Sequence, residues 1–327
     1  MDGLDSRLPG SAVNSAGEPA PSVKIPRALR IVLLSLLAVL MAAGLLAGAT
    51  WLYLHPHVSR TNNIVYGHLD GRDLALDVLR PANPNGLGVA VMVSGGWKSA
   101  APGSFPPWMA APLLRGGYTV FAVYHISQPQ ATVMQIFEEV SRAIRFIRHS
   151  ARQYGVDPDR LGVAGGSAGG HLSLLLATRG GPGPAEAADP VDRDSSAVQA
   201  VAIFFPVTDL LNLGRSTENA GDGGPPRSFV KAFGPQSTNL AVWKGIGREM
   251  SPIYYVRSNL PPTLILHGDA DTLVPLDQSE RYEAEAQKQG CRVQLVVHRG
   301  GRHGWWTMIW DIRQFAKWFD RYLAGKQ

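Results

Sequence analysis

The sequence predicts an α/β fold in which a mostly parallel β-sheet carries helices on both faces, preceded by one N-terminal transmembrane helix. From residue 64 onward, short apolar runs typical of buried strands alternate with segments of helical periodicity. One of these runs leads directly into a glycine-lined turn and a further helix, and residues 31–54 carry no charge. Strands that alternate with helices pair in parallel, because the helix makes the return crossing.

The N-terminal region divides into a tail and an apolar segment. Residues 1–26 are rich in Ser, Pro, Gly and Ala and lack apolar periodicity, so we expect a disordered tail. Residues 27–55 are predicted to form a transmembrane signal anchor. The uncharged run 31–54 would reach roughly 36 Å as a helix at about 1.5 Å per residue, which is enough to cross a bilayer.

The charges that flank this run predict its orientation. Lys24, Arg27 and Arg30 precede it, and Arg60 is the first charged residue after it. The positive-inside rule then places the N-terminus in the cytoplasm and the following domain outside it.

A cleaved signal peptide is the alternative for the same segment, and cleavage would leave a secreted or periplasmic protein. Residues 47–49 (AGA) resemble a small-residue cleavage site. The apolar run continues past that site through Trp51 and Tyr53, which favours a retained anchor.

Residues 64–324 are expected to form one catalytic domain. Two short apolar runs around Asp70 and Gly71 indicate an opening hairpin, and apolar positions at a helical period predict a helix over residues 134–154. The predicted strands are residues 65–69, 74–79, 88–93, 119–124, 161–164, 198–205, 262–266 and 293–297.

The turn after residues 161–164 reads Gly165-Gly166-Ser167-Ala168-Gly169. A serine on a sharp strand-to-helix turn presents its hydroxyl away from the backbone, and the first amides of the helix face any oxyanion that forms. The same short pattern is also typical of a glycine-rich helix start with a capping serine, so the partners of Ser167 decide between the two.

Asp271 and His303 are the predicted partners of Ser167. Each follows a strand-like run, and carboxyl ends of parallel strands meet at one edge of a sheet. Ser167 would attack a carbonyl carbon, His303 would take and return its proton, and Asp271 would orient the imidazole. Asp269 is the alternative acid and His267 the alternative base, although we expect Asp269 to form a turn and His267 to pack at the strand end.

Residues around the turn complete the predicted site. Gly95 and Gly96 follow the strand 88–93 and, with the amide of Ala168, would form an oxyanion hole; a plain strand-ending turn is the other interpretation of the glycine pair. The candidate pocket residues are Trp97, Gly166, His171 and Trp305. We expect no metal ion and no cofactor.

The chain resembles the α/β-hydrolase superfamily over residues 64–324, and within it the esterase/lipase branch similar to hormone-sensitive lipase and to bacterial feruloyl- and acetyl-xylan-esterase-like proteins. The resemblance implies hydrolysis of a small-molecule ester. The segments that carry it are 94–97 (SGGW), 154–160 (YGVDPDR), 165–171 (GGSAGGH), 251–253 (SPI), 267–271 (HGDAD) and 303–304 (HG).

Two segments depart from the pattern of that branch. Its oxyanion loop usually opens with His-Gly-Gly, whereas here Val93 and Ser94 precede Gly95 and Gly96. Because that histidine normally supports the loop and does not bind the oxyanion, we expect the backbone donors to be retained. Residues 125–129 read HISQP, where the resemblance leads one to expect Tyr-Arg.

Composition excludes some functions and leaves others open. The net charge of +5 comes from scattered Lys and Arg without a basic stripe, so we expect no nucleic-acid partner. A single cysteine, Cys291, excludes an internal disulfide framework, and no pattern predicts an oligomeric state. Two alternatives to an esterase remain: an amidase or peptidase on the same triad, and a catalytically silent hydrolase fold that binds a partner at the membrane.

Two insertions interrupt the alternation, at residues 179–197 and 212–250. The second precedes the strand that leads to Asp271, a place where a substrate cap is common, and a plain surface loop is the alternative. If it is a cap, Trp97, Trp243 and Trp305 are candidates for an apolar pocket wall.

Overall fold

The computed structural model describes residues 26–326. The chain divides into two compact units on either side of the bond between Trp51 and Leu52. Apart from Pro26, the tail predicted for residues 1–26 lies outside the described residues.

Helix α1 (Arg27–Leu54) contains the predicted apolar segment. It has 28 residues and contains an 18-residue stretch with a mean hydropathy of 2.6, and it is the one helix in residues 26–326 long and apolar enough to cross a membrane. At about 1.5 Å per residue it is roughly 42 Å long. Its length and composition suit a membrane anchor and equally a signal sequence.

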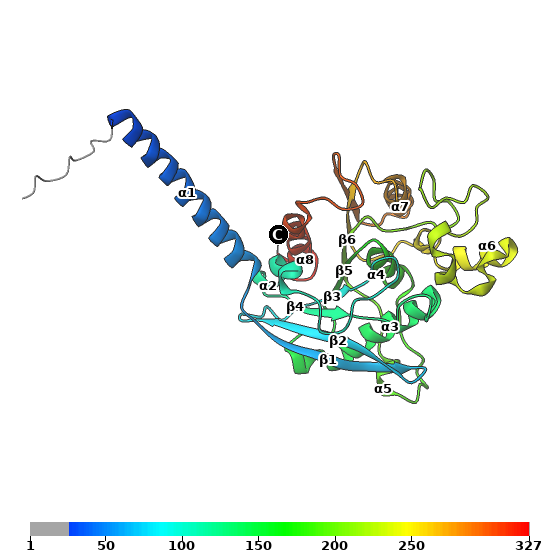
Figure 1. The fold of residues 1–327 in the computed structure, drawn as a ribbon. Coiled ribbons are helices and arrows are strands. Elements are labelled where there is room, and N and C mark those ends of the chain that lie inside the picture. The colour runs from blue at the N-terminus through cyan, green and yellow to red at the C-terminus, as the bar shows by residue number, and fades with distance from the viewer. Residues whose placement is uncertain (1–25, 327) are drawn as a thin grey trace, which may run out of the picture. The chain divides into compact units, whose positions relative to one another are not determined.

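The second unit contains one eight-stranded sheet, in the order β1-β2-β4-β3-β5-β6-β7-β8 (Figure 1). β1 and β2 form the antiparallel hairpin, β2 pairs antiparallel with β4, and all other pairs are parallel. The strands are β1 (Val58–Leu69), β2 (Arg72–Pro81), β3 (Gly88–Met92), β4 (Thr119–Val123), β5 (Leu161–Gly166), β6 (Ala200–Phe204), β7 (Thr263–Gly268) and β8 (Val293–His298).

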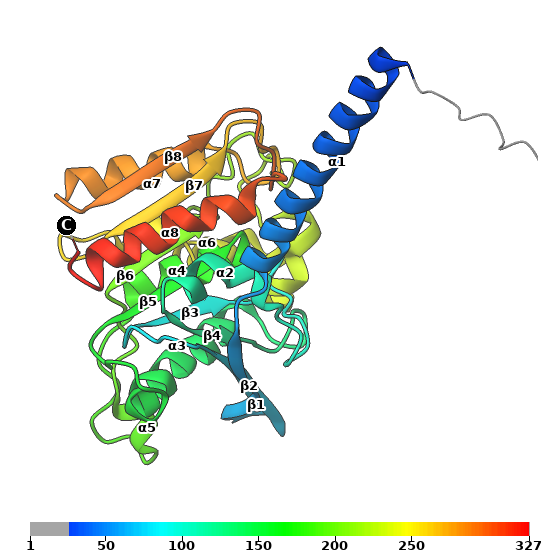
Figure 2. The same cartoon turned by 90° about the vertical axis from the view of Figure 1, so that its left-hand side faces the viewer.

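Helices cover both faces of this sheet, which confirms the predicted α/β-hydrolase architecture (Figure 2). The α-helices of the second unit are α2 (Ala111–Arg115), α3 (Val133–Ser150), α4 (Ala168–Arg179), α5 (Pro190–Arg193), α6 (Leu240–Glu249), α7 (Asp277–Lys288) and α8 (Met308–Tyr322). Short 3₁₀ helices are η1 (Pro107–Ala110), η2 (Ala151–Tyr154), η3 (Arg227–Phe233), η4 (Pro235–Thr238) and η5 (Pro252–Tyr255).

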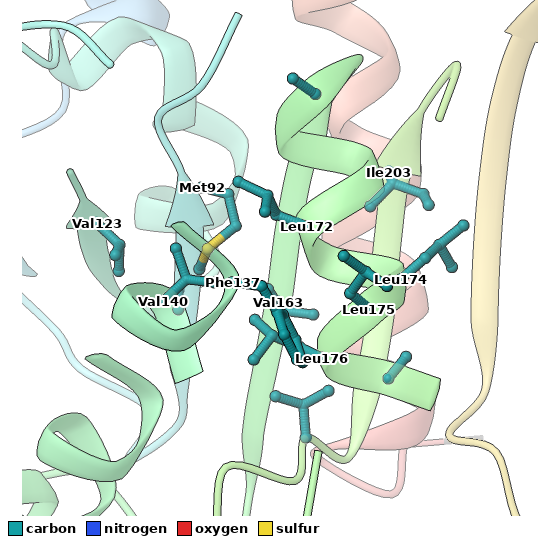
Figure 3. Close-up of a cluster of buried hydrophobic side chains, with 14 of the residues drawn as sticks. Met92, Val123, Phe137, Val140, Val163, Leu172, Leu174, Leu175, Leu176 and Ile203 are labelled. Carbon is teal, nitrogen blue, oxygen red and sulfur yellow. The ribbon is translucent and has the colours of Figure 1, made fainter. Parts of the chain in front are cut away.

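The core consists of two apolar clusters, one on each face of the sheet. Alternate residues of a strand point to opposite faces, so Val163 of β5 joins the cluster under α3 and α4 while Ala164 joins the cluster under α2 and α8. On the first face, Leu172, Leu175 and Leu176 of α4 pack in the same cluster as Val163 (Figure 3). Both faces being covered explains why the central strands appear as unbroken apolar runs.

The structure corrects two predicted boundaries. β1 begins at Val58, before the predicted domain start at residue 64, because its first half is a polar, largely exposed edge strand with no apolar pattern. The predicted helix 134–154 ends as an α-helix at Ser150 and continues as the 3₁₀ helix η2.

A buried carboxylate, that of Asp77 on β2, joins the hairpin to the rest of the second unit. Its oxygens accept hydrogen bonds from Arg60 (2.8 Å), the Tyr124 hydroxyl (2.6 Å) and the amides of Asn63 and Gly103 (both 3.1 Å). Burial and the bond to Asp77 raise the pKa of Tyr124 to about 12, so its hydroxyl keeps the proton that it donates.

Replacement of Asp77 by Ala should lower the free energy of unfolding by about 3 kcal/mol, because a half-buried guanidinium and a buried hydroxyl would lose their acceptor. Urea unfolding followed by tryptophan fluorescence measures the change. Asp73→Ala, on the same strand but with an exposed side chain paired with His68, should cost less than about 0.5 kcal/mol. Equal decreases in the free energy of unfolding in the two variants would contradict the conclusion that Asp77 joins the hairpin to the rest of the second unit.

Candidate active site

Ser167 occupies the sharp turn between β5 and α4. Its backbone angles, φ 54° and ψ −120°, lie in a region that residues with a side chain seldom adopt. Glycine neighbours permit the turn: a Cβ on Gly165 would lie 2.6 Å from the carbonyl of Gly169, and one on Gly169 would lie 2.5 Å from the oxygen of Met92. The turn is therefore held by close backbone packing that a larger residue would prevent.

Ser167, His303 and Asp271 form one continuous hydrogen-bonded chain. The Oγ of Ser167 lies 2.8 Å from Nε2 of His303, and Nδ1 of His303 lies 2.7 Å from Oδ2 of Asp271. The carboxylate can only accept, so Nδ1 carries a proton, and in the neutral form of the ring Nε2 is free to accept from the serine hydroxyl. In this arrangement His303 can take the proton of Ser167.

Asp271 is the buried end of this series of hydrogen bonds. Its other oxygen, Oδ1, accepts hydrogen bonds from the amides of Leu273 and Val274, each at 3.0 Å. Burial alone would raise the pKa of this carboxyl, but hydrogen bonds from His267 and His303 outweigh burial and hold its pKa well below the ordinary value. Asp271 is consequently ionised and available to stabilise a charged imidazole.

The two alternative residues have other partners. Asp269 accepts a hydrogen bond from the amide of Gly300 at 2.6 Å and lies on the exposed side of the turn. His267 is the penultimate residue of β7; its Nδ1 accepts from the hydroxyl of Ser279 at 2.7 Å, and its Nε2 donates to the carbonyl of Val274 at 2.7 Å and also lies 3.5 Å from Oδ2 of Asp271. Neither residue lies within hydrogen-bonding distance of Ser167, and neither takes the place of Asp271 or His303.

The candidate oxyanion donors differ from the prediction at one residue. The amide of Gly95 donates to the carbonyl of Lys98 at 2.9 Å, because the loop after β3 closes on itself there, so it is not a free donor. Within residues 26–326, the amides of Gly96 and Ala168 have no acceptor. These two remain available to an anionic oxygen beside Ser167.

A cavity of about 660 Å³ opens onto Ser167 and His303. Its wall is mostly apolar and comes from the loops after β3, β5 and β6, from the start of α8 and from the insertion 212–250. Glu218, a charged residue of this wall, is bound through its carboxylate to the amide and hydroxyl of Ser228. Apolar residues of the wall include Phe105, Met109, Leu213, Phe229, Met308 and Phe315.

The insertion 212–250 therefore forms part of the cavity wall and is more than a surface loop. The candidate Trp243 does not contribute to the wall: it is fully buried and donates to the carbonyl of Gly223 at 2.9 Å.

Of the four predicted pocket residues, Trp97 and Gly166 line the cavity, whereas His171 and Trp305 lie outside its wall. His171 is fully buried behind Trp97, accepts from its indole at 3.1 Å and donates to the carbonyl of Met250. Burial lowers the pKa of His171 to about 4, so the ring is a neutral structural link. The ring of Trp305 instead stacks on His298, and its indole donates to Asp311.

Sequence reasoning missed two residues near the site, Phe205 and His125. The Phe205 ring lies 4.5 Å from that of His303, centroid to centroid, and restricts its position. His125 lies beside the loop that carries Gly96. Phe205 is the first residue after β6 and His125 the second after β4, so their place at the carboxyl edge of the sheet was a usable signal.

No group of three or more His, Cys, Asp or Glu side chains in the described part of the chain could hold a metal ion.

Comparison with known proteins finds esterases. Residues 76–285 match the BD-FAE family. Esterase LipQ of Mycobacterium tuberculosis is 31% identical over 246 residues, which cover 72% of this chain and 54% of LipQ. The chain thus spans about half the length of such curated relatives.

Solved structures of similar fold include esterases. The truncated form of a carbohydrate esterase from gut microbiota matches with a TM-score of 0.65 and 25% identity, over 79% of this chain and 95% of that one. Esterase 2 of Thermogutta terrifontis matches with a TM-score of 0.63 and 26% identity, over 83% of this chain and 94% of that one. The same esterase has been solved phosphoramylated by tabun, and that structure matches with a TM-score of 0.62 and 25% identity, over 81% of this chain and 94% of that one.

The lowered pKa of Asp271 predicts a stability that depends on pH. An unfolded Asp takes up its proton near pH 3.9, whereas the folded Asp271 does so only at lower pH. The stability that Asp271 contributes is then complete above about pH 4 and declines as the pH falls further. Urea unfolding should show that the free energies of unfolding of wild type and Asp271→Asn become equal in acid. A constant difference between the two free energies from about pH 6 to about pH 2.5 would contradict the assignment of Asp271 as an ionised carboxylate.

Proposed function

Because the chain belongs to the BD-FAE family, in the esterase branch of the α/β-hydrolases, we propose that it is a serine esterase that uses Ser167, His303 and Asp271 as its catalytic triad. One observation carries the proposal: the unbroken chain of hydrogen bonds from the Ser167 hydroxyl to a buried, ionised carboxylate. The two free amides beside it supply what the tetrahedral intermediate needs.

The proposed reaction begins with the ester carbonyl beside Ser167 and its oxygen toward the amides of Gly96 and Ala168. Ser167 Oγ attacks the carbonyl carbon while Nε2 of His303 accepts the hydroxyl proton, and Asp271 stabilises the resulting imidazolium. The protonated His303 then donates that proton to the leaving alcohol, which departs as the acyl-enzyme forms. Water, activated by the same nitrogen, releases the acid and restores Ser167.

The cavity favours an ester with a substantial apolar part. Its volume of about 660 Å³ is within the usual range for small-molecule sites, and apolar side chains dominate its wall. Among the residues that the structure describes, the wall includes no Lys or Arg that could pair with an anionic substrate group, and its carboxylate, Glu218, would repel one. We therefore propose a neutral small-molecule ester as the substrate class.

We further propose that α1 remains attached as a signal anchor, with the N-terminus in the cytoplasm and the esterase domain outside it. The support is the uncharged run 31–54, the cluster of basic residues before it, and the continuation of the helix to Leu54, beyond the small residues 47–49. Secretion after cleavage is the competing outcome.

Wild type should react with a fluorophosphonate probe, and Ser167→Ala should abolish labelling and lower kcat/KM for an aryl ester by at least about 10³-fold. Labelling is read by mass spectrometry of the modified peptide. Ser104→Ala removes another serine from the cavity wall and should label as wild type does.

Two outcomes of that experiment would refute the esterase. A folded wild type that neither labels nor hydrolyses the ester would support a silent binding module. A preference for the matched aryl amide over the aryl ester would support an amidase.

The full chain should stay with the membrane after alkaline carbonate extraction, and deletion of residues 1–55 should release an active soluble domain, because α1 supplies the only described segment able to span. N-terminal sequencing of the mature protein completes the test. A soluble mature chain that begins directly after Ala49 would show cleavage and remove the anchor.

A further inference from the structure

The two departures from the esterase pattern, Ser94 in the loop after β3 and His125 after β4, contact each other. The Ser94 hydroxyl lies 2.8 Å from Nε2 of His125. The other ring nitrogen, Nδ1, lies 2.9 Å from the carbonyl of Ile126, which can only accept. Nδ1 therefore carries the proton, Nε2 is the acceptor, and the hydroxyl of Ser94 donates to it.

The surroundings of His125 keep its ring uncharged, with the proton on Nδ1. The residue is 7% exposed, and burial lowers its pKa to about 4, so the ring is neutral at physiological pH. The next residue, Ile126, is also held in place, since its amide donates to the carboxyl of Glu139 on α3 at 2.8 Å. The acceptor offered to Ser94 is consequently rigid.

The residues after His125 hold the rest of the same loop. The amide of Gln128 donates to the carbonyl of Trp97 at 3.0 Å, and its side chain reaches the carbonyl of Gly96 at 3.4 Å. The hydroxyl of Ser127 accepts from the amide of Ser99 at 2.9 Å. We call residues 125–128 the loop brace, because each bond joins them to residues 94–99.

The loop needs such support. Gly96 and Trp97 both have positive φ angles, 55° and 56°, and Trp97 is a bulky residue for which that conformation is strained. Ser94 also accepts, through its backbone oxygen, a hydrogen bond from the amide of Gly169 at 3.1 Å. Ser94 thus connects the loop that carries Gly96 to the helix that begins with Ala168.

We infer that His125 is a positioning residue, which acts through the hydroxyl of Ser94 to hold the amide of Gly96 in place and so substitutes for the histidine missing from the loop itself. This inference rests on the proposed function, because it assigns Gly96 and Ala168 as oxyanion donors. It extends that function to a support that the chain supplies from a different strand.

A second Ser-His pair for catalysis is a poorer explanation of the same contact. Ser94 lines the cavity, but His125 has a backbone carbonyl behind it, where His303 has the ionised Asp271. A buried imidazole without an anionic partner is a weak base.

The test compares Ser94→Ala with Ser196→Ala in the full-length protein. Ser94→Ala should lower kcat for an aryl ester about tenfold with KM within twofold, because a displaced donor stabilises the transition state less and leaves ground-state binding intact. Ser196 is a buried serine with hydrogen bonds to Gly181 in the surface segment before β6, and its variant should keep wild-type kcat.

A double-mutant cycle shows whether the two residues act through one contact. Ser94→Ala combined with His125→Leu should be no slower than His125→Leu alone. Additive losses, an unchanged kcat in folded Ser94→Ala, or fluorophosphonate labelling of Ser94 in Ser167→Ala would each overturn the inference.

Hydrogen exchange measured on the same variants does not depend on activity. Ser94→Ala should speed amide exchange in residues 94–99 while exchange in β7 and β8 stays as in wild type, and no change at 94–99 would overturn the inference. If wild type neither hydrolyses esters nor labels, the proposed function fails, and exchange still decides whether the loop brace exists.

Discussion

The close approach of the turn at Ser167 to the end of β3 is the constraint on which the site depends. Gly169 lies so near the oxygen of Met92 that no Cβ fits between them, and its amide binds the carbonyl of Ser94. This contact places the start of α4 against the loop after β3. Gly96 and Ala168, which lie far apart in the sequence, thereby come to line one cavity together with Ser167.

Burial divides the histidines around the site into different kinds. His125 and His171 are enclosed, their pKa values are lowered to about 4, and both make hydrogen bonds as neutral rings. His303 is partly exposed and has an ionised carboxylate behind it. Among these three rings, only His303 both lines the cavity and has an ionised carboxylate behind it, which is the combination that the proposed proton transfer requires.

Local patterns predicted the strands, the two-sided covering of the sheet and the residues that form the chain from Ser167 to Asp271. Apolar runs and strand ends are local properties, and the parallel topology then brings strand ends together. The commitment of Gly95 to Lys98 and the burial of His171 depend on how loops fold, which no local pattern contains. The contact between Ser94 and His125 was also beyond prediction, since the two departures are apparent separately in the sequence and their meeting is apparent only in three dimensions.

The insertion 212–250 contacts both the cavity and the loop after β3. Phe229 from this segment lines the cavity and also packs edge-on against Trp97, at 5.4 Å between ring centroids. A Cβ on Gly96 would lie 2.8 Å from the same Phe229 ring. Insertions of this kind can change in evolution to accept new substrates while the sheet stays constant. Here a change in the insertion would also alter the packing against the strained loop that contains Gly96 and Trp97. Laboratory redesign of the cavity would accordingly need to vary Phe229 and Trp97 together.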